Sequence, residues 1–187
     1  MANTGRVKVV LLSALATLLV AVVACGSDDG GAAAQPTDNG ANKIQRIFPS
    51  DRIYGKADLT GLGMKVMNDY DVSGLEQATS AVHLVLNQIE YEARFYGSLA
   101  DAVQYGAPWA DDVSGPDAVV TGDGVKWQEG AAHRRLCSRA AETPHSGCSY
   151  SARYGDFVIK GNMVLMCEGI DSEHALSACD AVLKPLE

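Results

Sequence analysis

The chain has 187 residues, with 15 lysines and arginines against 23 acidic residues and a net charge of −8 at pH 7. Nucleic acids and anionic lipid surfaces attract clustered Lys and Arg, so this balance argues against both as electrostatic partners. The length suits one ordinary domain with flanking segments, and the sequence contains no internal repeat.

The first 24 residues have the pattern of a secretory signal peptide. Arg6 and Lys8 give a positive start, and residues 9–24 follow as an apolar run interrupted only by Ser13 and Thr17. The run is shorter than the roughly 20 residues that a helix needs to cross a bilayer. We therefore expect cleavage; an uncleaved membrane anchor and ordinary signal cleavage near Ala24 are the alternatives.

The end of this run, Val22-Val23-Ala24-Cys25, resembles the lipobox of bacterial lipoproteins. In that family the cysteine thiol receives a diacylglycerol, the preceding peptide bond is cleaved, and the new amino terminus can be acylated. The resemblance implies that Cys25 is lipidated and that the Ala24–Cys25 bond is cut. Val22 stands where leucine is commoner in the family.

The segment after the cysteine has the composition of a flexible tether. Residues 26–42 contain no large apolar side chain, so they cannot bury enough surface to offset their ordering entropy. We therefore divide the chain into a signal peptide (1–24), a tether (25–43) and a globular domain (44–187). Loss of Arg6 and Lys8 with the signal peptide leaves a net charge of −10.

The first element predicted within the domain is a long amphipathic helix over residues 73–106. Ser73 and Glu76 have the spacing of a capping box, and Gly106 marks the end. Apolar residues recur at spacings of three and four, which is typical of one helix face. These residues are Val82, Leu86, Ile89, Ala93, Tyr96, Ala100 and Val103, and the residues expected on a solvated face are His83, Glu90, Glu92, Arg94 and Asp101.

The middle of the domain predicts two short elements. Residues 118–121 and 125–128 flank Gly122-Asp123-Gly124, which indicates a hairpin with a glycine-rich turn. Residues 131–141 then suggest a short helix.

The last third predicts a strand, a turn, a strand and a helix. The apolar runs 157–160 and 163–166 flank Gly161-Asn162, a two-residue hairpin signal, and their continuous apolarity predicts strands covered on both faces. Asp171 or Ser172 should cap a helix that ends near Pro185. This segment of about 40 residues resembles the end of some small actinobacterial envelope lipoproteins and sensor domains, without a diagnostic motif.

Four cysteines follow Cys25, and an even count in an exported chain indicates two disulfides. Three pairings are possible for Cys137, Cys148, Cys167 and Cys179. The hairpin register would place Cys148 too far from Cys167 for a disulfide. Cys167 at a strand end and Cys179 on the following helix can meet if that helix packs back on its own strand, so we favour Cys137–Cys148 with Cys167–Cys179. The expected fold class is thus α+β: a small disulfide-stapled domain with a long amphipathic helix, a short antiparallel sheet and a C-terminal helix.

Two metal sites are weaker alternatives to this interpretation. His133 and Cys137, followed by His145 and Cys148, have zinc-like spacing, but a disulfide would occupy both cysteines. The stretch Asp69-x-Asp71-x-Ser73-Gly74 matches the first half of an EF-hand loop, yet its twelfth position is Ser80 rather than Glu, which favours a polar turn. We expect no metal and no cofactor.

Catalytic signatures are mostly absent from the sequence, which contains no nucleophile elbow, zincin motif or phosphate-binding loop. We therefore expect a non-enzymatic binding or shielding module, held by lipid on Cys25 at the extracytoplasmic face of the cell membrane, with an envelope protein or ligand as partner. One alternative is a small envelope hydrolase using Trp109, Asp111 and Asp112; a pocket joining them to a histidine would favour it. Another is a phage-encoded lipoprotein that excludes other phages.

Overall fold

The computed structural model describes residues 44–137 and 150–186. These residues belong to the second of two compact units, Asn42–Glu187. The first elements in chain order are β1 (Ile47–Phe48), α1 (Lys56–Gly61), β2 (Lys65–Tyr70), β3 (Ser80–Leu86), β4 (Ile89–Phe95), α2 (Leu99–Asp101), a π-helical turn η1 (Ala102–Gly106) and α3 (Ala107–Asp111). They are followed by β5 (Arg135–Cys137), β6 (Tyr150–Ala152), β7 (Tyr154–Lys160), β8 (Met163–Glu168), α4 (Ser172–Leu183) and a 3₁₀ turn η3 (Lys184–Leu186).

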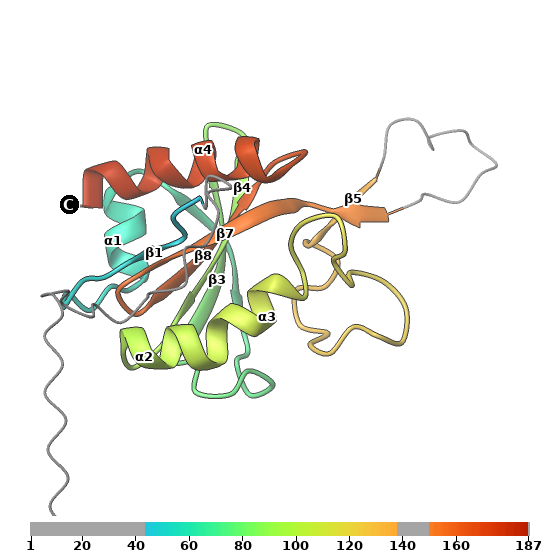
Figure 1. The fold of residues 1–187 in the computed structure, drawn as a ribbon, viewed down its shortest axis with the longest axis horizontal. Coiled ribbons are helices and arrows are strands. Elements are labelled where there is room, and N and C mark those ends of the chain that lie inside the picture. The colour runs from blue at the N-terminus through green and yellow to red at the C-terminus, as the bar shows by residue number, and fades with distance from the viewer. Residues whose placement is uncertain (1–43, 138–149, 187) are drawn as a thin grey trace, which may run out of the picture. The chain divides into compact units, whose positions relative to one another are not determined.

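Six strands form the central sheet, in the order β1-β7-β8-β4-β3-β2, and β5 pairs with β6 in a separate two-stranded sheet. All neighbours in the central sheet are antiparallel except β1 and β7. Helices α1 and α4 lie on one side of the sheet and the run α2–η1–α3 lies on the other (Figure 1). The described domain is therefore mixed α+β, with a larger sheet than the sequence predicts.

The predicted C-terminal hairpin is present as β7 and β8. Lys160 lies opposite Met163, and Gly161 has a φ of 53°, a left-handed conformation that glycine adopts without steric cost. Asn162 is buried, and its side chain bonds the backbone of Tyr54 and Tyr96. Strand β8 lies between β7 and β4 with helices on both sides, which explains the continuous apolar pattern of the two strands.

The long helix predicted over residues 73–106 is wrong. Its first two thirds form the hairpin β3–β4, in which Ser80 pairs with Phe95 and Leu86 with Ile89. Asn87 and Gln88 make the two-residue turn with φ values of 52° and 68°, the conformation that such hairpins require. The same region also has apolar residues at every second position, such as Tyr91, Ala93 and Phe95. This alternation is typical of a strand, and pairing with the neighbouring strands of the sheet favours it over a helix.

A helical segment does occur at the end of that region, but it begins at Leu99. It runs through α2, η1 and α3 and continues past Gly106, where the sequence predicted its end. A Cβ atom on Gly106 would lie 2.7 Å from side-chain atoms of both Tyr96 and Val164. Gly106 thus permits close packing of this segment on the sheet rather than terminating it.

The two elements predicted in the middle of the domain are also wrong. Residues 118–128 form no strand, and residues 131–134 form turns before β5. Val120, Val125, Trp127 and Ala131 are buried, so this segment contributes isolated side chains to the interior instead of a backbone ladder. A local pattern of apolar residues does not distinguish a buried strand or helix from an irregular segment whose side chains are buried.

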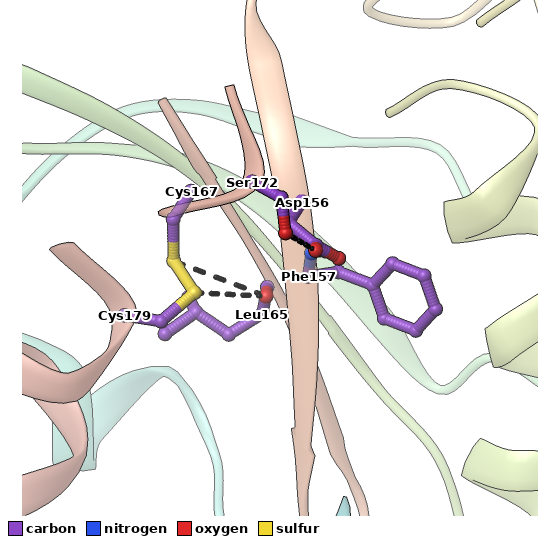
Figure 2. Close-up of a disulfide and its surroundings, with 6 residues drawn as sticks. All are labelled: Asp156, Phe157, Leu165, Cys167, Ser172 and Cys179. Atoms are coloured by element: carbon purple, nitrogen blue, oxygen red, sulfur yellow. Dashed lines mark hydrogen bonds between the residues drawn. A yellow bond between two sulfur atoms is a disulfide. The ribbon is translucent and has the colours of Figure 1, made fainter. Parts of the chain in front are cut away.

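The helix α4 begins after Asp171, as the sequence predicts, and the Asp171 side chain accepts a hydrogen bond from the backbone N–H of His174. Cys179 on this helix forms a disulfide with Cys167 at the end of β8, with a Cα–Cα distance of 5.7 Å (Figure 2). The carbonyl oxygen of Leu165 lies 3.6 Å from Sγ of Cys179. The disulfide therefore links α4 to the strand on which it packs.

Candidate binding site

Charged residues of β4 point into the interior of the domain. Tyr91, Ala93 and Phe95 face α1 and α4, whereas the alternate residues Glu92 and Arg94 face the opposite side. Both charged side chains are completely buried, with 0% exposure. The prediction that Glu92 and Arg94 lie on a solvated helix face is wrong. They belong to a strand, and the segment 119–134 covers the side of the sheet on which they lie.

Glu92 is held between two guanidinium groups. Its carboxylate accepts hydrogen bonds from Nε of Arg94 at 2.7 Å and from Nε and Nη2 of Arg134 at 2.7 and 3.1 Å. Burial disfavours the charged carboxylate most strongly, but the two guanidiniums and their hydrogen bonds together lower the pKa of Glu92 below its ordinary value. Glu92 is therefore ionised at neutral pH.

Aromatic rings complete the surroundings of these charges. The ring of Trp127 lies 4.2 Å from the guanidinium carbon of Arg134 and 5.1 Å from that of Arg94. Nη1 of Arg134 also donates to the backbone oxygen of Trp127. Cations over an indole face are attracted by its quadrupole, so Trp127 partly replaces the water that both guanidiniums lose on folding.

A second polar group lies beside this cluster. Tyr70 and His133 share a hydrogen bond of 2.7 Å between the phenol oxygen and Nδ1, and the His133 ring stacks on that of His83. Burial, followed by the nearby His83, lowers the pKa of His133. Glu90 binds His83 at 2.8 Å and Arg153 at 2.9 Å. The charged groups thus continue from the buried Glu92 toward half-buried positions.

A small cavity adjoins the buried cluster. It is lined by both tryptophans of the chain, by Arg94 and Arg134, and by Asp112 and Lys126, which form an ion pair. Its volume of about 10 Å³ corresponds to roughly one water molecule. The positive charges that line it are more numerous than the negative ones.

A much larger groove lies near the start of α4 and has a volume of about 870 Å³. Its lining is mainly apolar and includes Pro116, Ala118, Leu136, Ala152, Tyr154 and Ile170. Ile170 is 82% exposed, although it is a large apolar residue. The hydroxyl of Tyr154 is buried and has no hydrogen-bond partner within residues 44–137 and 150–186. The groove therefore offers mainly apolar surface. The Tyr154 hydroxyl is not exposed to it, because Tyr154 is completely buried.

A polar hollow of about 170 Å³ shares several lining residues with the groove. Asp156, which is almost fully buried, accepts hydrogen bonds there from Nη2 of Arg46, from Ser172 and from the backbone N–H of Phe157 (Figure 2 shows the latter two). Ser172 belongs to the first turn of α4. These bonds fix the wall between the groove and the hollow.

The residues of the predicted hydrolase site do not form one site. Trp109 and Asp112 line the water-sized cavity, whereas Asp111 lines the polar hollow. Among the described residues, no histidine lines either cavity.

The predicted calcium-loop residues have other partners. Asp69 binds Nζ of Lys56 at 2.6 Å, and Asp71 accepts the backbone N–H of Ser73, which lowers the pKa of Asp71. They lie at the end of β2 and in the following turn. The region is a polar turn, as expected, but no helix follows it.

Several predicted site residues lie outside the described part of the chain. These are Ala24, Cys25, His145 and Cys148, so the lipid site, the Cys137–Cys148 disulfide and the zinc alternative stay predictions. Within the described residues, no group of three or more His, Cys, Asp or Glu side chains is placed to hold a metal ion. None of the helices described there is both long enough and apolar enough to cross a membrane.

The fold and the site define a mixed α+β domain with a central sheet, a disulfide-linked helix, a buried cluster of charges and an open groove. The chain belongs to a family of unknown function, DUF6810, whose pattern it matches over residues 56–187. This range includes β4, the segment 119–134 and α4. Comparison with curated proteins and with solved structures finds no significant match.

Proposed function

We propose that this protein is a lipid-anchored binding protein on the extracytoplasmic face of the cell membrane. A diacylglycerol on Cys25 holds the chain at the membrane, and the tether lets the domain move close to the headgroups. The groove near α4 takes a small ligand with an apolar body. Tethering raises the effective concentration of the domain for partners in the envelope.

The anchoring part of the proposal is supported by two features. The sequence Val22-Val23-Ala24-Cys25 at the end of a short apolar run resembles a lipobox. The Cys167–Cys179 disulfide suits an oxidising compartment outside the cytoplasm, where such bonds persist. We propose Cys137–Cys148 as a second disulfide of the same domain.

The groove is the observation that carries the binding function. Sites for small molecules have volumes of about 300 to 1,000 Å³, are mostly apolar and contain a few polar groups that orient the ligand. The 870 Å³ groove with its exposed Ile170 fits that description. The lining also includes the polar residues Ser151, Glu168 and Asp171, which can orient a ligand.

A solvatochromic, uncharged dye such as Nile red tests the groove directly. We expect the full-length protein in mild detergent to bind the dye above the detergent background, and the Ile170→Ser variant to bind it several-fold more weakly. Ile53→Ser is the matched control, because Ile53 is also an exposed isoleucine, at 64%, and does not line the groove. Equal weakening in both variants, or in neither, would contradict the assignment.

A Cys25→Ser variant tests the anchor. We expect the parent protein to be found in the membrane fraction of a bacterial host. The variant should carry no lipid, and its amino terminus should differ because the Ala24–Cys25 bond is no longer cut. Metabolic labelling with a radioactive fatty acid provides the readout. Labelling of the Cys25→Ser variant to the level of the parent would place the lipid elsewhere or show that no lipobox is used.

A further inference from the structure

We propose that the water-sized cavity beside Arg94 is a binding site for a single halide ion, chloride in the cell envelope. The structural feature behind this inference is an excess of buried positive charge. Glu92 carries one negative charge, while Arg94 and Arg134 each carry one positive charge, and the three side chains are at most 1% exposed.

The hydrogen bonds of the two guanidiniums show where the excess charge lies. All three nitrogens of Arg134 have partners, two contacts going to Glu92 and one to the Trp127 carbonyl. Nε and Nη2 of Arg94 both contact Oε1 of Glu92 at 2.7 Å. Nη1 of Arg94 is buried and has no hydrogen-bond partner among the described residues. This donor is therefore the unsatisfied group in the cluster.

An unpaired charge in the interior costs much more free energy than a paired one. The Trp127 ring compensates part of this cost but carries no net charge. Arg94 lines the cavity, and the one carboxylate among its described lining residues, Asp112, is paired with Lys126. An anion in the cavity would neutralise the buried excess, which a water molecule cannot do.

The size of the cavity selects the class of anion. A volume of about 10 Å³ provides space for roughly one particle of the size of water, which favours a monatomic anion over sulfate, phosphate or a carboxylate-bearing molecule. A halide is spherical and accepts hydrogen bonds from any direction, so the free Nη1 donor of Arg94 places no demand on its orientation. Lys126, whose side chain is 61% exposed, and Val119 lie at the outer side and provide access from solvent.

Tryptophan fluorescence reports on this site because both tryptophans of the chain, Trp109 and Trp127, line the cavity. The full-length protein in non-ionic detergent is titrated with sodium chloride or bromide at constant ionic strength, with sodium sulfate as the balancing salt. We expect a saturable change in fluorescence with the halides and a rise in the unfolding temperature with chloride, because an ion that binds only the folded state stabilises it.

Lys126→Gln is the test variant that preserves the buried cluster. It leaves Asp112 without its partner and lowers the local positive charge, so we expect halide affinity to fall several-fold. Lys56→Gln is the matched control, because Lys56 is likewise an exposed lysine paired with an aspartate, Asp69, and does not line the cavity. Arg94→Met should abolish the halide response. If this variant does not fold, the comparison of Lys126→Gln with Lys56→Gln still tests the proposal.

Four results would overturn the proposal. A linear, unsaturated fluorescence change would indicate collisional quenching, and an equal response to sulfate would indicate general screening. Equal halide affinities of the parent and Lys126→Gln would place the ion elsewhere. No response to any halide would leave a bound water as the occupant.

Discussion

At β4, the two sides of the central sheet are built by different means, although the same strand supplies both. On the side of α1 and α4, β4 contributes Tyr91, Ala93 and Phe95 to an apolar core that a disulfide fastens to α4. On the other side it contributes Glu92 and Arg94, which are covered by the segment 119–134. Along β4, the first side is held by packing and the second by charges that must remain paired. Strands β7 and β8 also supply apolar residues to the second side, among them Phe157, Val164 and Met166.

This difference teaches where the molecule tolerates change. Apolar packing loses stability in proportion to the atoms removed, whereas a buried ion cluster loses much more when one partner disappears, because the others stay charged. The cluster also lines the small cavity, so substitutions in it should change both the stability of the fold and the proposed binding of a halide ion. The following predictions test this contrast, beginning with the largest expected effect.

Glu92→Gln should have the largest effect on stability. It leaves the two buried guanidiniums of Arg94 and Arg134 without their counter-charge, and breaking such a cluster costs about 3 to 5 kcal/mol in the free energy of unfolding. Urea denaturation followed by circular dichroism measures the loss. Glu173→Gln, an exposed position on α4, is the control with the same chemical change and should be nearly neutral. Similar small losses in both variants would refute the role of the cluster.

Removal of the Cys167–Cys179 disulfide tests the opposite side. The bond closes a loop with a sequence separation of 12, for which chain-entropy estimates give about 3 kcal/mol. The double variant Cys167→Ala/Cys179→Ala should therefore fold with a lower unfolding free energy but an unchanged fluorescence response to halides. A loss of the halide response would show that the two sides are not independent.

Asn162→Ala tests the residue that joins the two sides. Its amide accepts the backbone N–H of Tyr54 at 2.7 Å and donates to the carbonyls of Tyr54 and Tyr96, at the end of β4. Truncation leaves these buried backbone groups unpaired, for an expected cost of about 2 kcal/mol. Asn87→Ala, in the exposed turn between β3 and β4, is the comparison. It changes only how readily the residue adopts the left-handed φ of 52°. Asn162→Ala should be the more damaging of the two.

The smallest effect is a pH dependence assigned to His133. Burial and the neighbouring His83 lower its pKa in the folded state, while Glu90 opposes this shift and Arg134 and Arg153 add to it. The unfolded chain therefore binds the proton more readily, and stability should fall as the pH drops below the ordinary histidine pKa of about 6.5.

The measurement is the unfolding free energy between neutral and mildly acidic pH. His133→Gln should flatten its slope relative to the parent. A steeper slope in His133→Gln than in the parent would mean that protonated His133 stabilises the fold.

The C-terminal third was predictable because its signals are local. Gly161-Asn162 between apolar runs determines a tight turn, and Asp171 caps the helix that follows. These features depend on residues a few positions apart. The link between Cys167 and Cys179 followed from the same local geometry, since the helix folds back on its own strand.

The buried cluster could not be recognised in the same way. Glu92 and Arg94 alternate with apolar residues, which fits an amphipathic strand with one wet face, and the spacing of their apolar neighbours also fitted a helix. What buries them is Arg134 and Trp127, more than 30 residues further along the chain. The one local signal for the hairpin was Asn87-Gln88, whose left-handed turn separates the two strands.

The central claim is that the chain is an exported, lipid-anchored protein, and its intact mass tests that claim most directly. Mass spectrometry is carried out on protein purified from the membrane fraction of a bacterial host, with and without reduction. We expect a chain that begins at Cys25, carries a diacylglycerol and gains one hydrogen for each of its four other cysteines on reduction. A mass that retains residues 1–24, or an unlipidated chain with free thiols, would contradict it.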